Sequence, residues 1–351
     1  RNNYQLACDI APNSNTLAVV KANAYGHGAI EVAKALEPMA PALAVACIEE
    51  AIDLRGAGIK KPILLLEGVF TYGEVQIAAD KDFWLVVENV QQLEFIEKTI
   101  EKGVLKKDLK IFLGIDSGMH RLGFMPEEVP NIYARLSALK NVQSPVVLTS
   151  HFAAADDQTN DFTNQQIATF KKAIEGLEGE TSLANSAGIL AWPESHGSWN
   201  RPGFMLYGTS PFEVPQVDAD KLSPVMSLVS KVISVRDIKI GETVGYAQSW
   251  KAERDSKIAT ITVGYGDGYP RHAKPGTPVV IDGRRGKLVG RVSMDMITVD
   301  VTDIPSVSVG SDVELWGEQL HINEVAEWAG TIGYELMTRM PLRAPRIYIN
   351  R

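Results

Sequence analysis

The sequence contains little cysteine, no long apolar run and no excess of basic charge. Its only cysteines, Cys8 and Cys47, are too few and too far from any ligand pattern for a disulfide scaffold or a zinc site, so we expect no metal. No run approaches the roughly 18 apolar residues that a membrane-spanning helix needs, so we expect no membrane association. A formal net charge of -8 argues against a nucleic-acid partner, which would require a basic face.

Two further signals are missing. The opening stretch RNNYQLACDI lacks the basic segment and apolar core of a signal peptide, and we expect a cytoplasmic protein. The loop G-x-G-x-x-G does not follow the first apolar run, which disfavours an open dinucleotide-binding sheet. The 351 residues are enough for about two domains, or for one large barrel plus an accessory domain.

The first two-thirds of the chain alternates short apolar runs with helical patterns. Strands are expected at 16–21, 42–46, 62–66, 83–87, 110–115, 146–150, 182–185 and, more weakly, 199–201, with helices such as 48–55, 89–102, 126–140 and 161–175. Apolar strands separated by helices indicate a parallel sheet that is covered on its faces. Eight such units over about 200 residues predict a (β/α)8 barrel over residues 1–221, with an open doubly wound sheet as the alternative.

The pattern of apolar and polar residues changes after about residue 221. Segments such as SLVSKVISVRD, KIATITVG, TPVVIDG and DMITVDVTDI alternate apolar with polar residues and are broken by glycine or proline. This alternation is typical of half-buried antiparallel strands. Residues 222–351 are therefore predicted to form a mostly β C-terminal domain, interrupted by one helix at 322–329.

Polar residues recur where the barrel strands are expected to end. Chemistry in a (β/α)8 barrel sits at the C-terminal ends of the strands, so these residues should meet at one mouth. Any single one could be a solvated loop residue. The set is Lys21, Asp116, Arg121, His151, Asn185, Ser186 and Arg201.

Lys21 ends the first apolar run, in VVKANAYGHG. It could simply extend its amine out of the mouth into water. In a partly desolvated site its pKa would fall and its amine would become nucleophilic, able to form a Schiff base with a carbonyl compound or with pyridoxal phosphate. That cofactor also needs a phosphate cradle and a group facing its pyridine nitrogen.

The stretch NRPGFMLYG offers both features. Proline favours the first position of a helix, so Pro202 predicts a short helix whose N-terminal N–H groups, from Gly203 and Phe204, face an anion. Ser186 could add its hydroxyl, or could be a plain helix cap. Arg201, at the start of this stretch, is placed to reach the other end of a cofactor ring.

Eight motifs along the chain resemble those of the alanine racemases. In family order they are VVKANAYGHG, DSGMHRLG, SHFAAAD, NSAGIL, RPGFMLYG, VGYGDGYPR, GRVSMDM and YELMTR. The resemblance spans nearly the whole chain. It implies a homodimer of a pyridoxal-phosphate barrel and a β domain that interconverts L- and D-alanine and supplies D-alanine for peptidoglycan.

The resemblance also implies roles for individual residues. Lys21 would be the Schiff-base lysine, and Arg201 would face the pyridine nitrogen with His151 behind it. Arg121 and the backbone N–H of Met294 would hold the substrate carboxylate. The cofactor phosphate would be held by Tyr25, Ser186, Gly203, Phe204 and Tyr334, with Asn185 beside them.

Racemisation needs a base on each face of the α-carbon. By similarity Lys21 serves the face that exchanges a proton with D-alanine, and Tyr265, from the β domain of the other subunit, serves the L face. A free tyrosine has a pKa of about 10, which is high for a base at neutral pH. A chain of hydrogen bonds through His151 to Arg201 would supply the positive charge that lowers it.

Several of these residues also have plain structural explanations. Tyr265 could be a turn residue packed on a domain seam, and His151 a satisfied barrel histidine. Tyr334 could be a helix or core aromatic, and Met294 a gap-filler in the core. No role is evident for His27.

The chain departs from the family pattern in two places. Gly114 stands where many members have a lysine, often carbamylated, that supports the carboxylate-binding arginine. We therefore expect water, an anion or another side chain beside Arg121. The family also has about a dozen residues upstream, including a strand that joins the β domain, and this sequence is expected to begin inside the first helix.

Other functions remain open on the sequence. A racemase of broader or serine specificity would carry the same motifs. A basic amino-acid decarboxylase of this architecture should place an acid, not Arg201, at the pyridine nitrogen. A non-enzymatic cofactor-carrying barrel would lack the β domain that holds Tyr265.

Overall fold

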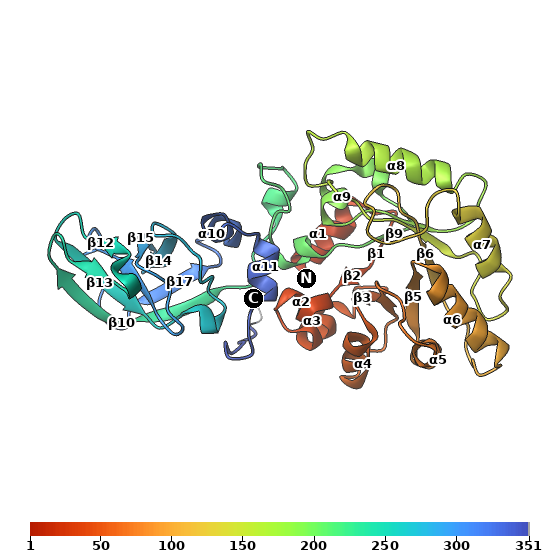
Figure 1. Cartoon of the computed structure of the whole chain (residues 1–351), viewed down its shortest axis with the longest axis horizontal. Helices are drawn as coiled ribbons and strands as arrows, with labels where there is room; N and C mark the ends of the chain where they lie inside the picture. Colours follow the sequence, from red (N-terminus) through yellow and green to blue (C-terminus); the bar gives the residue numbers. More distant parts are fainter. Residues whose placement is uncertain (350–351) are drawn as a thin grey trace. The chain divides into compact units, whose positions relative to one another are not determined.

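The computed structural model describes residues 1–349 and separates them into two compact units. The first unit comprises residues 1–24, 28–206 and 210–222. The described part of the second unit comprises residues 25–27, 207–209 and 223–349. Each unit is described by itself (Figure 1).

The first unit is built on parallel strands whose side chains are almost entirely buried. A seven-stranded parallel sheet runs in sequence order through β2 (Ala18–Val19), β3 (Leu43–Val45), β4 (Ile63–Leu65), β5 (Phe83–Val87), β6 (Ile111–Gly114), β7 (Val147–Thr149) and β8 (Thr181–Ser182). Strands covered on both faces need apolar side chains on both, which is why β2 to β7 are mostly Ala, Val, Ile, Leu and Phe, while the short β8 is Thr181–Ser182.

An eighth strand closes this sheet into a barrel. Strand β1 (Asn15–Thr16) pairs in parallel with β9 (Trp199–Asn200), and β1 runs on into β2. The N–H of Leu17 donates to the carbonyl of Asn200 at 2.8 Å, and the N–H of Arg201 donates to the carbonyl of Ala184 at 2.9 Å. The predicted (β/α)8 barrel is confirmed, although the seventh strand ends earlier than the expected 182–185.

Helices alternate with the barrel strands and lie outside them (Figure 1). They are α1 (Asn2–Ile10), α3 (Ala29–Leu36), α4 (Ile48–Gly56), α5 (Tyr72–Lys81), α6 (Val90–Glu101), α7 (Val129–Ser137), α8 (Phe162–Ala173) and α9 (Ser186–Ala191). The expected helix after Arg201 is only a four-residue 3-10 turn, η2 (Phe204–Tyr207). Short 3-10 turns η1 (Pro193–Ser195) and η3 (Ala219–Lys221) complete this part of the chain.

The second unit is an antiparallel barrel, consistent with the alternation in its sequence. Six strands close in the order β10 (Leu228–Ile238), β13 (Ser256–Ile261), β16 (Ile297–Asp300), β15 (Arg284–Val289), β14 (Pro278–Ile281) and β17 (Asp312–Trp316). Strand β10 pairs with both β13 and β17, and its register shifts once against each. Such bulges bend a strand, which allows one long strand to close a small barrel.

Other elements of this unit surround the small barrel. They are the strand pair β11 (Thr243–Val244) and β12 (Trp250–Lys251), the turns η4 (Tyr246–Gln248) and η5 (Tyr265–Asp267), and the helices α10 (Ile322–Ala329) and α11 (Gly333–Thr338). The sequence predicted α10 as the one helix here, so α11 is a correction. Its six residues, GYELMT, are too few to show a helical period.

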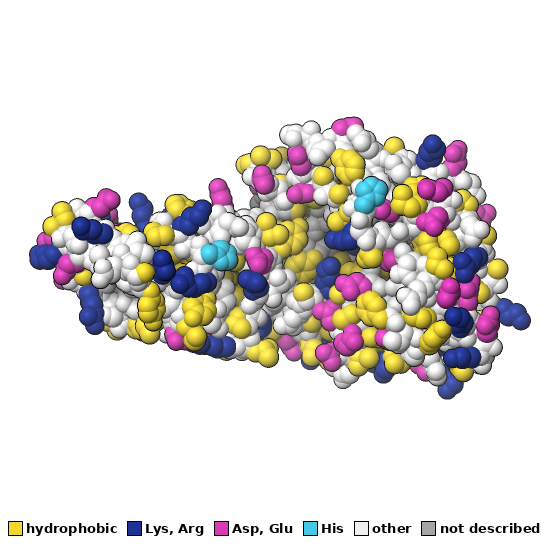
Figure 2. Space-filling model, in the orientation of Figure 1, with side chains coloured by type: hydrophobic (Ala, Val, Ile, Leu, Met, Phe, Trp, Pro, Cys, Tyr) yellow, Lys and Arg dark blue, Asp and Glu magenta, His cyan; other side chains and the backbone are white. Residues whose placement is uncertain are grey.

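Charged side chains of both signs are interspersed over the visible surface (Figure 2). This distribution offers no broad basic face on that side, in keeping with the net charge of -8. Within residues 1–349, no helix has both the length and the apolar character needed to cross a membrane.

Candidate active site

The segment that follows Lys21 is a left-handed turn, labelled α2 (Lys21–Tyr25). Its last four residues, Ala22 to Tyr25, have φ between 50° and 55°. For residues other than glycine this conformation costs roughly 1–2 kcal/mol each. The Glu50 carboxylate opposes that cost by accepting the N–H groups of Ala22 at 2.7 Å and Ala46 at 2.8 Å. Backbone strain of this kind concentrates at functional sites, and here it directly follows the candidate lysine.

Lys21 itself lies half-buried at the end of β2. Desolvation lowers the pKa of its ammonium group, and the positive charges of Arg121 and Arg201 act in the same direction. The carboxylates of Glu67 and Glu50 oppose this shift. The environment therefore shifts Lys21 toward the neutral amine, which is the form that acts as a nucleophile or a base.

Arg201 is buried in the barrel and is held by five hydrogen bonds. Its Nη1 donates to Thr149 Oγ1 and to the carbonyl and hydroxyl oxygens of Ser182. Its Nη2 donates to the carbonyls of Ser150 and Leu183. Because all five bonds use the two Nη atoms, Nε is the donor that can face a ligand. Desolvation lowers the pKa of Arg201 to about 10, so it stays charged at neutral pH.

Glu88, at the end of β5, fills the space that a side chain at Gly114 would need. A Cβ on Gly114 would lie 2.6 Å from the Glu88 carboxyl carbon. Desolvation raises the pKa of Glu88 to about 7, while the positive charges of Arg201 and Arg121 act to lower it and the negative charge of Asp116 acts to raise it. Another side chain, one of the three expected fillers, thus lies in the space beside Gly114.

The loop that carries Arg121 is organised by Asp116. One carboxylate oxygen of Asp116 accepts the N–H groups of Gly118 at 2.9 Å and His120 at 3.0 Å, and the other lies 3.0 Å from His120 Nδ1. Although desolvation alone would raise it, these hydrogen bonds lower the pKa of Asp116. Asp116 therefore has a structural role, and it leaves the side chain of Arg121 exposed at the mouth.

His151, after β7, lies among the same cations. Desolvation, together with the charges of Arg201, Arg121 and Lys21, lowers the pKa of His151 to about 3. Its side chain is exposed at the mouth, where the three neighbouring cations disfavour a charged imidazole. A neutral imidazole carries one donor and one acceptor, so it suits a relay better than a charged one would.

Asn185 and Ser186 divide two tasks at the start of α9. Asn185 caps the helix, since its side-chain oxygen accepts the N–H of Gly188 at 2.9 Å. The buried Ser186 hydroxyl instead accepts the N–H groups of Gly203 at 3.0 Å and Met205 at 3.2 Å. The plain explanation of Ser186 as a helix cap is therefore wrong, and its oxygen lies at the start of η2, where an anion was expected.

In the second unit, three tyrosines and His27 form an aromatic cluster. The rings of Tyr25 and Tyr207 stack at 4.8 Å between centroids, and Tyr334 lies 6.2 Å from Tyr25. His27 stacks on Tyr207 at 4.6 Å, which gives this residue a packing role that the sequence did not reveal. Burial raises the pKa of Tyr25 to about 12, so its hydroxyl is a donor at neutral pH rather than a base.

Tyr265 and Met294 are brought together by backbone hydrogen bonds. The N–H of Tyr265 donates to the carbonyl of Ser293 at 3.0 Å, and that of Gly266 donates to the carbonyl of Met294 at 2.9 Å. A Cβ at Gly264 would collide with these carbonyls, so the approach requires glycine. Tyr265 is 41% and Met294 is 51% exposed. Both therefore face outward from the β unit, and neither is a core residue.

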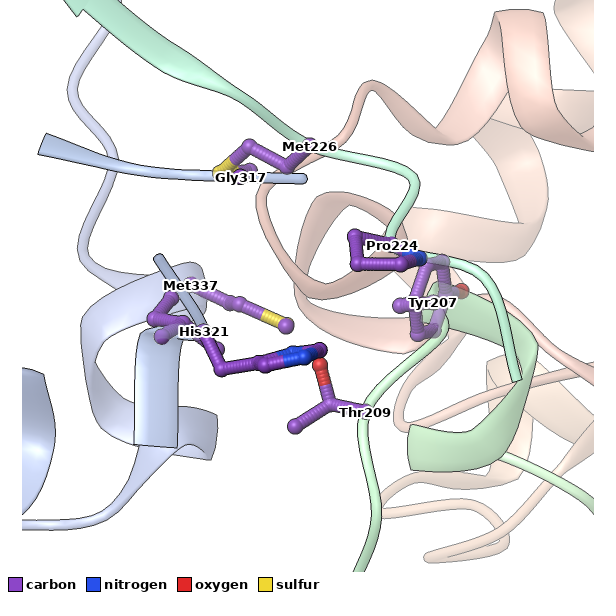
Figure 3. A pocket seen from close by; sticks show the side chains of 8 residues that line it. Tyr207, Thr209, Pro224, Met226, Gly317, His321 and Met337 are labelled. Carbon is purple, nitrogen blue, oxygen red and sulfur yellow. The ribbon is translucent and has the colours of Figure 1, made fainter. Parts of the chain in front are cut away.

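A small pocket within the second unit shares Tyr207 with the aromatic cluster. Tyr207, Thr209, Pro224, Met226, Gly317, His321, Ile322 and Met337 line it. Figure 3 shows the His321 ring between Met337 and Thr209. The lining holds a single titratable group besides the tyrosine, so the barrel mouth is the better candidate for chemistry.

The barrel unit therefore gathers Lys21, Arg121, His151, Asn185, Ser186, Arg201, Gly203 and Phe204, while the β unit gathers Tyr25 with Tyr334 and Tyr265 with Met294. The sequence did not single out Glu50 or Glu88. A signal for Glu88 was present, because an acid directly follows the buried run FWLVV. Glu50 had none, since it appears as one more acid in the first turn of a helix.

Comparisons with known proteins agree with this architecture. Residues 1–211 match the model of the alanine racemase N-terminal domain, and residues 225–348 match that of the alanine racemase C-terminal domain. A catabolic alanine racemase of Pseudomonas putida is 51% identical over 349 residues, which cover 99% of this chain and 96% of the relative. An alanine racemase of Pseudomonas taetrolens is 50% identical with the same coverage.

Solved structures show the same relationship. The biosynthetic alanine racemase of Pseudomonas aeruginosa superposes with a TM-score of 0.95 at 45% identity, covering 100% of this chain and 96% of the other. An alanine racemase of Bartonella henselae with covalently bound pyridoxal phosphate gives 0.90 at 31% identity, covering 99% and 96%. Fold and site thus define an isomerase built from a parallel barrel and a β domain. The chain belongs to the alanine racemase family.

Proposed function

We propose that this protein is a pyridoxal-phosphate-dependent racemase that interconverts L- and D-alanine. The observation that carries the proposal is Lys21, a lysine held at the barrel rim on a strained turn, with its pKa lowered by desolvation and by Arg121. A lysine in such a setting suits covalent capture of a carbonyl compound. Both first-named curated relatives are called alanine racemases.

The residues at the mouth fit pyridoxal phosphate. The positive charges of three side chains, Lys21, Arg121 and Arg201, all act on His151 and lower its pKa. Such a concentration of positive charge is expected of a site that binds an anionic ligand. The Ser186 hydroxyl, which accepts the N–H of Gly203 and keeps its own hydrogen to donate, would hold the phosphate at the start of η2 beside Gly203 and Phe204, with Tyr25 and Tyr334. When bound, the cofactor supplies the electron sink that makes the α-proton of an amino acid removable.

Two residues would move that proton. On one face of the α-carbon, Lys21 would take the proton as a neutral amine and return it as the ammonium. Tyr265, from a second copy of the chain, serves the other face, since a single base would have to cross the molecule. The exposure of Tyr265 supports this role, because a base that acts in another subunit has to project from its own.

The remaining residues hold the reactants in place. Arg121 and the N–H of Met294 would bind the substrate carboxylate. Arg201 would donate to the pyridine nitrogen and leave it unprotonated, because its pKa of about 10 is still far above neutral pH. Aromatic side chains near the cofactor would leave room for a small side chain such as a methyl group.

Chiral chromatography of products tests the activity. The protein loaded with pyridoxal phosphate is incubated with single L-amino acids, and we expect D-alanine to form fastest. Conversion of serine or lysine at the same rate would replace the proposal with a racemase of broader specificity.

A growth assay tests the proposed supply of D-alanine for peptidoglycan. Expression of the chain should allow a bacterium that lacks its own racemases to grow without added D-alanine. Growth that still requires D-alanine, from an active protein, would favour the catabolic role for which the Pseudomonas putida relative is named.

A further inference from the structure

The Glu88 carboxyl group lies at the barrel mouth, in the space that is left open because Gly114 has no side chain. Strands β5 and β6 are neighbours, and Val87 pairs with Leu113 in their parallel register. Glu88 and Gly114 come next on the two strands. The carboxyl carbon of Glu88 lies where a side chain at position 114 would begin. Glycine at 114 therefore leaves room for the Glu88 carboxyl at its present position, and a larger residue would require that carboxyl to shift.

The backbone around Glu88 is fixed by the start of α6. The N–H of Glu88 donates to Gln92 Oε1 at 2.8 Å, and Gln92 Nε2 donates to the carbonyl of Glu67 at 2.7 Å. Asn89 caps the helix by accepting the N–H of Gln92 at 3.0 Å. Gln92 is buried and thus ties the ends of β4 and β5 together. The backbone of Glu88 is therefore held by Gln92, which is itself bonded to the residues after β4 and before α6.

The charges that act on Glu88 come from the elements around the mouth. Arg201, after β9, and Arg121, after β6, favour its ionised form, and Asp116, also after β6, disfavours it. Glu88 is in turn the carboxylate whose charge raises the pKa of Arg201. The acceptors that hold Arg201 are otherwise neutral carbonyl and hydroxyl oxygens.

We propose that Glu88 is the counter-charge of Arg201 and Arg121, admitted by the gap at Gly114, and that it sets how strongly the mouth binds the carboxylate of its ligand. This inference rests on the proposed function, which makes that ligand an amino acid. Glu88 is a positioning residue, because it acts through the arginines and does not itself touch the substrate.

The sign of the effect follows from the pKa of Glu88, which burial raises to about 7. Below pH 7 Glu88 is protonated and neutral, so the positive charges of Arg201 and Arg121 are not offset and a carboxylate ligand binds more tightly. Above pH 7 the negative charge of Glu88 offsets theirs and weakens binding. Binding of an anion should therefore be accompanied by proton uptake.

Propionate is a suitable probe, because it carries the carboxylate and methyl group of alanine but no amino group. Its dissociation constant is measured by titration calorimetry on the protein loaded with pyridoxal phosphate, at pH 6 and pH 8, in two buffers of different ionisation enthalpy. We expect binding about threefold to tenfold weaker at pH 8, together with a buffer-dependent heat that reports proton uptake. Equal constants and buffer-independent heats would overturn the proposal without any substitution.

The variant E88Q removes the charge and keeps the shape. It should bind propionate at pH 8 as tightly as the unsubstituted protein does at pH 6, and it should lose the pH dependence. The control E94Q makes the same change on the exposed face of α6 and should leave both constants unchanged. Weaker propionate binding by E88Q at both pH values would show a purely structural role and overturn the proposal.

Racemase activity separates this inference from the proposed function. Normal racemisation of alanine with pH-independent propionate binding contradicts the role of Glu88 alone. Failure of the unsubstituted protein both to racemise alanine and to bind propionate contradicts the proposed function.

Discussion

The barrel mouth and the outer loops of the β unit present candidate catalytic groups in opposite ways. Lys21 and Arg201 are enclosed by their own unit, with pKa values shifted by desolvation and by neighbouring charge. Tyr265 and Met294 are joined by backbone bonds but remain 41% and 51% exposed. The barrel groups are thus adjusted by their own unit, whereas Tyr265 and Met294 face away from theirs.

Replacing Lys21 should have the largest effect, because on the proposed function it removes a base and the point of cofactor attachment together. We expect K21A to lose at least about 10⁴-fold in kcat. Racemisation of L-alanine is measured by polarimetry. Added methylamine should restore a small part of the activity if the loss is chemical. A variant that retains more than a few per cent of activity would contradict the role assigned to the barrel mouth.

Replacing Tyr265 should have the next largest effect, and it should fall on one face of the substrate. We expect Y265F to lose about 10²- to 10⁴-fold in kcat, the usual contribution of a positioned acid–base group. In deuterium oxide the variant should still exchange the α-proton of D-alanine, at the face served by Lys21, faster than it racemises. The control Y246F changes another exposed tyrosine of the same unit and should be neutral.

Filling the gap at Gly114 tests the packing of the mouth. G114A should destabilise the protein by about 1–3 kcal/mol, because its Cβ would overlap the Glu88 carboxyl. Removing that carboxyl should relieve the clash, so G114A in an E88A background should cost at least about 1 kcal/mol less. The free energies of unfolding are measured in urea.

A matched control makes this result specific to the mouth. Gly56 at the end of α4 has open space where its Cβ would lie, so G56A should change stability little. An equal cost for G114A with and without Glu88 would show that the two residues do not compete for space.

Loosening the left-handed turn should have the smallest effect. Both oxygens of Glu50 accept backbone N–H groups, and in E50Q one of them is replaced by a donor that cannot. We expect kcat to fall about tenfold, equivalent to about 1.4 kcal/mol, because Lys21 is held less firmly. The control E49Q changes the adjacent exposed residue and should leave kcat unchanged. Equal kcat values for E50Q and E49Q would contradict the role of Glu50 in holding Lys21.

The sequence revealed much of the barrel because its strands are continuous apolar runs. Lys21 could be placed at the mouth because it directly follows such a run, and Arg201 because it ends the last, weaker expected strand, since parallel strands end together. Helix α11 was missed because six residues are too short to display a period. The left-handed turn was hidden because Ala22 and Ala24 favour right-handed helix and give no local sign of a positive φ.

The partners of the site were harder to predict. Glu88 meets Gly114 only through the register of two neighbouring strands, which no local pattern states. A plain helix cap was one explanation of Ser186, because serine and asparagine cap helices about equally well and the sequence does not show that its neighbour Asn185 is the actual cap. Long-range register and competition between adjacent capping residues are therefore what the sequence could not resolve.

A mixing experiment tests most directly the claim that the β unit completes the barrel of another copy. K21A and Y265F proteins, each inactive alone, are combined under conditions that allow subunits to exchange. In a twofold dimer with shared sites, half of the subunit pairs are hybrids and each hybrid contains one intact site. The account predicts recovery of about a quarter of the activity of the unsubstituted protein. If the mixture exchanges subunits and stays inactive, each site is built from a single chain and the account is wrong.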